Sequence, residues 1–365
     1  MKILLLGEYS NVHATLAEGL KVLGHEVTVA SNGDFWKDYP RDIDLQRTIS
    51  FMGSFSFLYR LTKAFSTFKG YDIVQLINPL FIETKAHHLF PLYRFLRRHN
   101  RHIVLGAYGM DYYWVKTCIT EKPLRYSDFN FTDELRTDEN AIKEQQDWIG
   151  TDKEQLNMMI AKDCDAIVAG LYEYWVCYHP SFPEKTTFIP YPIKDMAHPV
   201  GISTEAHHPL RLFIGINKSR SVYKGTDIML RAAQALQAHY VGKVELHVAE
   251  DVPFNEYMEM MSQSDAILDQ LYSYTPAMNA LGAMAKGIIC VGGGESENYE
   301  ILGETQLRPI VNVQPDYQSV YQALEELILH PERIPMLKQQ SIEYIRRHHD
   351  YLKVARQYES LYLSL

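Results

Sequence analysis

Short apolar runs alternate along this chain with segments that carry apolar residues on one helical face. Residues 3–6 form a run typical of a buried strand, and apolar residues between Val12 and Leu23 then recur at helical spacing. Gly24 stands where helices commonly end, and a second strand pattern follows at residues 26–30. This strand–helix–strand opening predicts a parallel sheet in an α/β fold.

The same alternation continues to the end of the chain. In the first half, further strand patterns occur at residues 72–76, 102–105, 165–168 and 187–190. In the second half they occur at residues 211–215, 244–248, 266–268 and 287–291, and the tail after Asp316 is helical with breaks near Pro331 and Pro335. An aromatic stripe at residues 54–68 predicts a core-facing helix, with a membrane-contact face as the alternative.

The alternation of strand and helix patterns begins again in the second half, which predicts two domains. A chain of 365 residues is large for one hydrophobic core. Residues 194–209 contain prolines and glycine and few apolar side chains, which favours a linker. We therefore predict a Rossmann-like domain at residues 1–192, a linker at 193–209 and a second Rossmann-like domain at 210–345. Residues 112–150, within the first domain, are polar and aromatic and show neither helical nor strand periodicity. This segment is either a functional lid or loosely ordered chain.

Charge and composition exclude several classes of protein. The formal charge of -9 argues against general nucleic-acid binding, which needs a basic face. No apolar run approaches the roughly 20 residues of a membrane span, and the N-terminus lacks the features of a signal peptide. Four widely spaced cysteines indicate reduced thiols of a cytoplasmic protein. We predict no metal site, because the adjacent histidine pairs at 87–88 and 348–349 would not face one another on a helix.

The loop after the first strand of the second half is rich in cations. It contains Asn217, Lys218 and Arg220, and then Lys224 before Gly225 and a helix start. Lysine supplies a point charge and arginine can bind two oxygens at once, so this loop suits a diphosphate. A solvated basic loop is the alternative.

Residues 265–294 read as a strand, a polar loop, a helix and a second strand that ends in three glycines. Thr275 followed by Pro276 is typical of a helix start, because the hydroxyl can cap a free N–H and proline fits the first helical position. A helix start just beyond the carboxyl end of a strand is where open α/β sheets bind anions and nucleotides. A strand–helix–strand unit without a ligand would show the same pattern.

The same stretch resembles the donor-binding segment of the retaining GT-B glycosyltransferases (glycosyltransferase group 1, family 4-like). Residues 282–287 and the glycines at 292–294 match the end of the family pattern. Both acids of the family's Glu-x7-Glu motif are replaced, by Tyr274 and Gly282. One of the glutamates at 295–300 could take the place of the ribose-binding acid, and a solvated helix start rich in acids is the alternative.

The resemblance implies the GT-B architecture, with two Rossmann-like domains facing across a cleft and a C-terminal helix at 346–365 returning to the N-terminal domain. It makes Tyr108 and Asp111, which stand at the positions of a His-Gly-x-Asp motif, catalytic candidates, although a turn explains Gly109 equally well. The predicted donor-binding residues are Gly7, Asn217, Lys218, Arg220, Lys224, Tyr274, Thr275, Ala277, Met278 and Gly282. Glycine inside a helix costs roughly 1 kcal/mol relative to alanine, so we expect the donor to approach Gly282 and Gly282→Glu to block it.

The resemblance implies a metal-independent hexosyltransferase that moves a sugar from a nucleotide-sugar donor, with retention, to a glycan or lipid-linked glycan such as a capsular polysaccharide. The acceptor would bind the first domain near residues 112–150. A non-catalytic nucleotide-sugar binding protein and a sugar-nucleotide epimerase of the same fold remain open as alternatives. We expect no cofactor besides the donor substrate, since the loop at 7–11 lacks a dinucleotide fingerprint. We expect a cytoplasmic protein, with peripheral contact at the inner face of the membrane left open.

Overall fold

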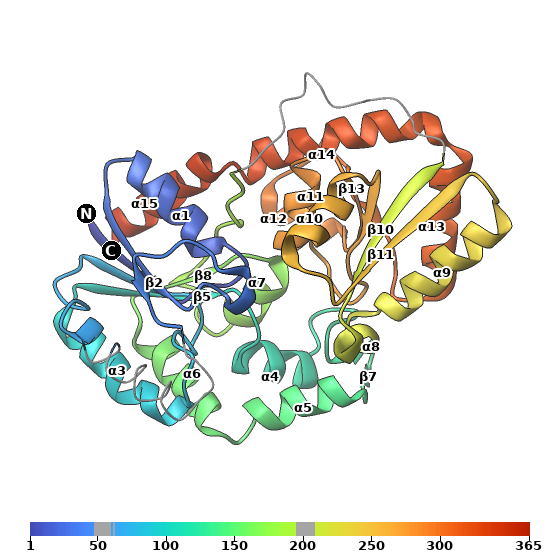
Figure 1. Ribbon diagram of the computed structural model, residues 1–365. Coiled ribbons are helices and arrows are strands. Elements are labelled where there is room, and N and C mark those ends of the chain that lie inside the picture. The colour runs from blue at the N-terminus through green and yellow to red at the C-terminus, as the bar shows by residue number, and fades with distance from the viewer. Residues whose placement is uncertain (47–59, 61–62, 195–208) are drawn as a thin grey trace. The chain divides into compact units, whose positions relative to one another are not determined.

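The computed structural model describes residues 1–46, 60, 63–194 and 209–365 (Figure 1). The chain forms two compact units. Unit 1 comprises Met1–Pro123, Glu144–Pro192 and Tyr351–Leu365, and unit 2 comprises Leu124–Lys143 and Ile193–Asp350. The predicted linker lies almost wholly outside the described residues, as does most of the predicted helix at 54–68. Phe65 and Phe68, at the end of that helix, pack in the core of unit 1.

The described residues of unit 1 form a parallel sheet of seven strands in the order β3-β2-β1-β4-β5-β8-β9. The strands are β1 (Lys2–Leu6), β2 (Glu26–Ser31), β3 (Ile43–Asp44), β4 (Ile73–Leu76), β5 (His102–Ala107), β8 (Ala166–Ala169) and β9 (Thr186–Phe188). Leu5 of β1 pairs with Val29 on one side and Gln75 on the other. The central strands are mostly apolar along their length, as expected where helices cover both faces of a parallel sheet.

Helices of unit 1 follow the strands along the chain. They are α1 (Val12–Val22), η1 (Phe35–Lys37), α3 (Ala86–His99), α4 (Tyr112–Thr120), α6 (Asp152–Asp163), α7 (Tyr172–Tyr178) and α15 (Tyr351–Ser364), and α5 (Glu139–Trp148) continues from unit 2 into unit 1. Asp111 and Thr151 accept hydrogen bonds from the first turns of α4 and α6 and so begin these helices. Residues 112–150 are therefore structured, and the alternative of loosely ordered chain is wrong.

The C-terminal helix α15 packs against α1 inside unit 1. Gly19 of α1 allows the close approach, because a Cβ there would lie 2.7 Å from the Cβ of Ala355 and 2.8 Å from the carbonyl oxygen of Tyr351. The buried hydroxyl of Tyr362 donates a 2.5 Å hydrogen bond to Gln75 in β4. The predicted return of the C-terminal helix to the N-terminal domain is confirmed.

Unit 2 contains a parallel sheet of five strands among its described residues, in the order β11-β10-β12-β13-β14. The strands are β10 (Leu210–Ile216), β11 (Val244–Glu250), β12 (Ala266–Leu268), β13 (Ile289–Gly292) and β14 (Val311–Asn312). The helices are η2 (Lys218–Arg220), α8 (Ser221–Lys224), α9 (Thr226–His239), α10 (Phe254–Ser262), α11 (Met278–Met284), α12 (Ser296–Leu302), α13 (Tyr317–Leu329), η3 (Pro331–Arg333) and α14 (Ile334–His348). Pro331 opens η3 between α13 and α14, whereas Pro335 lies in the first turn of α14 and does not break it.

Residues 124–143 differ from the predicted domain boundaries. We predicted that residues 1–192 form one domain, but this segment lies in unit 2. It contains a hairpin of β6 (Asn130–Phe131) and β7 (Glu134–Leu135), and Figure 1 shows β7 beside α8. We call residues 124–143 the strap. Its contacts with unit 2, described below, are the physical reason for its placement.

Candidate functional site

The predicted donor-binding loop follows β10 at the carboxyl edge of the unit 2 sheet. Asn217 caps η2, because its side chain accepts a 3.1 Å hydrogen bond from the N–H of Ser219. Lys218 is an exposed residue and forms an ion pair with Glu250 at the end of β11. One predicted polar residue therefore shapes the loop, and one predicted cation already has an acidic partner.

Two further predicted cations flank the single turn of α8. The exposed guanidinium of Arg220 lies 5.1 Å from the ring centroid of Tyr223. Lys224 ends α8, and Gly225 follows it at a φ of 73°, a conformation that side chains rarely adopt. A Cβ at Gly225 would lie 2.8 Å from the Cβ of Leu271. Glycine therefore lets this loop pack closely on the loop after β12.

The ammonium group of Lys224 is half-buried and lies near two carboxylates. Its Nζ is 3.7 Å from Oδ1 of Asp128 in the strap. Burial raises the pKa of Asp269, just past β12, to about 6, although the charge of Lys224 and a hydrogen bond from Asn279 act to lower it. Asp128 and Asp269, both in unit 2, thus partly neutralise the charge of Lys224.

Arg125 anchors the start of the strap to the loop after β13. Its guanidinium donates hydrogen bonds of 2.6 Å to Glu295 and of 2.6 Å to Glu297. Glu295 also accepts a 2.5 Å bond from the hydroxyl of Tyr126 and bonds from two side-chain amides. Burial acts to raise the pKa of Glu295, but these donors leave it lowered. Glu295 is therefore held by contacts with the strap and with two side-chain amides, and a ribose-binding role for one of the glutamates at 295–300 stays a prediction.

Arg136 anchors the other side of the strap to α8. Its guanidinium donates hydrogen bonds of 3.0 Å to the carbonyl oxygens of Val222 and Tyr223. The same group lies 3.5 Å from the ring centroid of Tyr272, after β12. The strap is thus docked on the last turn of α8, directly before the lysine predicted to hold a diphosphate.

Tyr274, one of the predicted donor-binding residues, is a contact point of the strap. The residue is buried, and its hydroxyl accepts a 2.7 Å hydrogen bond from the backbone N–H of Arg125. The centroid of its ring lies 4.9 Å from the ring centroid of Tyr126. The same centroid lies 4.8 Å from the guanidinium carbon of Arg125. In this conformation the Tyr274 side chain, which was predicted to contact the donor, contacts the strap instead.

The helix after β12 begins later than predicted. Met278 is the first residue of α11, and Ala277 precedes it in an extended conformation. The cap predicted at Thr275 is wrong. The carbonyl oxygen of Tyr274 accepts the N–H of Glu295 at 3.1 Å, so the backbone here is tied to the loop after β13 instead of entering a helix.

Gly282 lies inside α11 with open space beside it. A Cβ at this position would meet no described atom within 4 Å apart from its chain neighbours and its own helix. The protein itself therefore leaves room for a side chain at position 282, and the expected block of the donor by Gly282→Glu stays a prediction.

The two catalytic candidates are both buried in unit 1. The hydroxyl of Tyr108 shares a hydrogen bond with that of Tyr358 in α15. Asp111 accepts a 2.9 Å bond from the N–H of Trp114 and a 2.8 Å bond from the hydroxyl of Tyr178, and burial raises the pKa of Asp111 to about 7. Each residue thus has a structural task, one tying α15 to the sheet and the other beginning α4.

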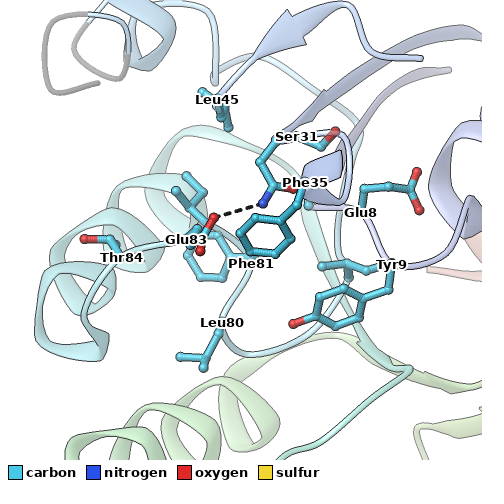
Figure 2. A pocket seen from close by; sticks show the side chains of 13 residues that line it. Glu8, Tyr9, Ser31, Phe35, Leu45, Leu80, Phe81, Glu83 and Thr84 are labelled. Carbon is cyan, nitrogen blue, oxygen red and sulfur yellow. Dashed lines mark hydrogen bonds between the residues drawn. The ribbon is translucent and has the colours of Figure 1, made fainter. Parts of the chain in front are cut away.

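Gly7 lines a pocket of about 190 Å³ in unit 1, at the carboxyl ends of β1, β2 and β4 (Figure 2). The pocket is lined by Gly7, Glu8, Tyr9, Ser31, Asn32, Phe35, Leu45, Ile77, Leu80, Phe81, Ile82, Glu83 and Thr84. Asn32 donates a 3.0 Å hydrogen bond to Glu83 in its wall. Apolar walls with a few polar groups are typical of sites for small ligands.

Among the described residues, no group of three or more His, Cys, Asp and Glu side chains is placed to hold a metal ion. The helices of the described part are all too short or too polar to span a membrane. The four cysteines are buried free thiols.

Comparison with solved structures identifies the architecture. The chain is similar to sucrose-phosphate synthase from Thermosynechococcus elongatus, with 14% identity, a TM-score of 0.62 and coverage of 100% of this chain and 99% of that one. HepE from Anabaena in complex with UDP-glucose has 12% identity and a TM-score of 0.62, with both chains covered in full at 100%. UDP-GlcNAc 2-epimerase from Neisseria meningitidis, bound to UDP-GlcNAc, has 13% identity and a TM-score of 0.54, again with 100% of both chains covered.

The chain has the GT-B fold. Protein-family models give no match to the sequence, and neither do curated proteins. The solved structures that it resembles include glycosyltransferases and an epimerase of UDP-sugars. Identities of 9–14% establish the fold alone and not the reaction.

Sequence reasoning missed the acids around Lys224. Asp269 directly follows the apolar run of β12, at the carboxyl end of a strand, where ligands bind in open α/β sheets. Its position in the sequence could therefore have marked it as a candidate site residue. Asp128 and the strap arginines lie in a polar stretch without periodicity, and no local pattern marks them.

Proposed function

We propose that this protein is a glycosyltransferase that uses a nucleotide-sugar donor. The observation that carries the proposal is Lys224, followed by the left-handed Gly225, at the carboxyl edge of the unit 2 sheet of a GT-B fold. HepE was solved with UDP-glucose and the Neisseria epimerase with UDP-GlcNAc, and both span this whole chain. A nucleoside diphosphate sugar is therefore the proposed ligand of unit 2.

In the proposed reaction, an acceptor hydroxyl oxygen becomes bonded to the anomeric carbon of the sugar, and its proton passes to an oxygen of the leaving diphosphate. The bond from that carbon to the diphosphate breaks, and the diphosphate keeps the electron pair. Lys224 and Arg220 would stabilise the charge that develops on this leaving group, as fixed cations do in other active sites. Because these side chains supply the charge, the proposal includes no metal ion and no cofactor besides the donor.

The proposed acceptor site is the pocket of unit 1. Phe81 and Leu80 offer apolar surface for the face of a sugar ring, and Glu83 and Ser31 offer hydrogen-bond acceptors for its hydroxyl groups. A glycan or a lipid-linked glycan under construction, including a polysaccharide of a capsule, fits such a pocket. The resemblance to retaining enzymes supports transfer with retention.

An epimerase remains the second candidate. Both acids of the Glu-x7-Glu motif are replaced, and the likeness to UDP-GlcNAc 2-epimerase covers the entire chain. A binding protein without turnover is the third reading, supported by the same replacement of the acids.

One experiment separates these functions. The purified protein is incubated with UDP-glucose or UDP-GlcNAc, with and without oligosaccharide acceptors, and followed by proton NMR. Transfer predicts loss of donor and a new anomeric signal in the acceptor, with the α-configuration of the donor retained. A new sugar nucleotide without release of UDP would identify an epimerase. Saturable binding without any product would identify a binding protein and contradict the transferase.

A further inference from the structure

The strap places a carboxylate beside the lysine that we propose for the donor diphosphate. Asp128 is buried, and its Oδ1 lies 3.7 Å from Nζ of Lys224. This distance is an ion-pair distance but exceeds that of a direct hydrogen bond. Asp128 and Lys224 therefore attract each other electrostatically without forming a direct hydrogen bond.

Other contacts hold Asp128 in place. On one side of it, Arg125 bonds to Glu295 and Glu297. On the other side, Arg136 bonds to the last turn of α8. Because these charge-assisted bonds position the strap, they hold the backbone at Asp128 beside Lys224 whether or not the ion pair itself is favourable.

The strap contacts the two loops on which the proposed donor site depends. Arg136 docks on the carbonyl groups just before Lys224, and Arg125 donates its N–H to Tyr274. A diphosphate that approached Lys224 would meet Asp128 beside it, and two anions beside one cation repel each other. The donor diphosphate and the Asp128 carboxylate therefore compete for the ammonium group of Lys224.

We propose that Asp128 is an intramolecular competitor of the donor diphosphate, which tunes the affinity of Lys224 for its anionic ligand. This inference rests on the proposed function, because it assumes that Lys224 binds a diphosphate. Donor binding requires the Asp128 carboxylate to move away from Lys224 or to tolerate the added negative charge. The strap thus lowers the affinity for free nucleotide and favours ligands whose other contacts offset this cost.

The test compares Asp128→Asn with Glu134→Gln, an exposed acid of the same strap. Calorimetry measures the binding of inorganic pyrophosphate and of UDP to each full-length protein. We expect Asp128→Asn to tighten binding of both probes by about fivefold, the upper end for a partly exposed ion pair, and Glu134→Gln to change it by less than about twofold. Asp128→Ala serves as a second variant, and thermal unfolding shows that each protein is folded.

The Lys224→Ala background separates this inference from the proposed function. If Asp128→Asn tightens binding in the native background and has no effect in Lys224→Ala, the competition is supported. If Lys224→Ala weakens binding but both Asp128 variants bind like the native protein or more weakly, the competition is wrong and the donor site stands. If Lys224→Ala leaves binding of both probes unchanged, the proposed donor site and the inference built on it both fail.

Discussion

The hydroxyl of Tyr274 accepts a 2.7 Å hydrogen bond from the backbone N–H of Arg125, 149 residues earlier in the chain. Tyr274 was predicted from the sequence to contact the donor, and in this structure its hydroxyl anchors the strap. The strap and the two loops that it contacts form one connected substructure of unit 2.

Removal of the Tyr274 hydroxyl should loosen the strap. Tyr274→Phe leaves the Arg125 N–H without its acceptor, a loss of about 1 kcal/mol, which is typical of an intramolecular hydrogen bond. Hydrogen exchange is expected to accelerate at residues 124–136 and to stay unchanged in the unit 1 sheet. The matched control is Tyr317→Phe, because Tyr317 is 39% exposed. Unchanged exchange in the strap would show that this bond does not hold it.

Replacement of Lys224 should weaken donor binding. Lys224→Ala is expected to lose about 1.5–3 kcal/mol of affinity for UDP-glucose or UDP-GlcNAc, the range for hydrogen bonds to charged groups. Lys243→Ala, an exposed lysine directly before the opposite end of β11, is the control. Calorimetry with each sugar nucleotide measures the difference. Equal affinities for the two variants would remove Lys224 from the site.

Much of the fold was predictable because it depends on local patterns. The buried strands at 3–6 and 266–268 and the amphipathic α1 are marked by runs and spacings that a parallel sheet requires. The return of α15 followed from the resemblance to GT-B proteins.

The strap was not predictable in the same way. Its two strands contain two residues each, and the side chain of Asn130 holds the turn through bonds to the carbonyl groups of Leu124 and Thr132. Its anchors join residues far apart, such as Arg125 and Glu295 at a separation of 170 positions. Hydrophobic periodicity carries no information about such polar pairs. The cap expected at Thr275 failed for the same reason, since a distant loop holds its backbone.

The stability of unit 2 should fall in acid through Glu304. This buried carboxylate accepts bonds of 2.7 Å from His348 and 3.0 Å from Arg347, and further bonds from the N–H groups of Gln306 and Leu307. Burial acts to raise its pKa, but these partners lower the pKa of Glu304 to about 2. A lowered carboxyl pKa stabilises the fold above the ordinary value of 4.5, and this contribution is lost as the pH falls toward 2.

Glu304→Gln makes this pH dependence measurable. The variant should be less stable than the native protein above about pH 5, and the difference should shrink as the pH falls through the window between these two pKa values. Denaturant unfolding at a series of pH values measures it. Glu343→Gln removes an acid that is 49% exposed and lies 3.8 Å from the same Arg347, and should change stability little. A difference independent of pH would mean that the charge of Glu304 is not what stabilises unit 2.

A glutamate introduced at Gly282 should be accommodated, because a Cβ there meets no described atom within 4 Å apart from its chain neighbours and its own helix. Gly282→Ala is the control, and it should stabilise α11 by about 1 kcal/mol through helix propensity alone. Gly282→Glu should also fold, and its affinity for a sugar nucleotide should equal or exceed that of Gly282→Ala, since the carboxylate can accept bonds from ribose hydroxyls. Thermal unfolding and calorimetry measure the two effects. If Gly282→Glu folds but binds the donor more weakly than Gly282→Ala, then the donor itself fills the space beside α11, and the pocket has been rebuilt around the missing side chain.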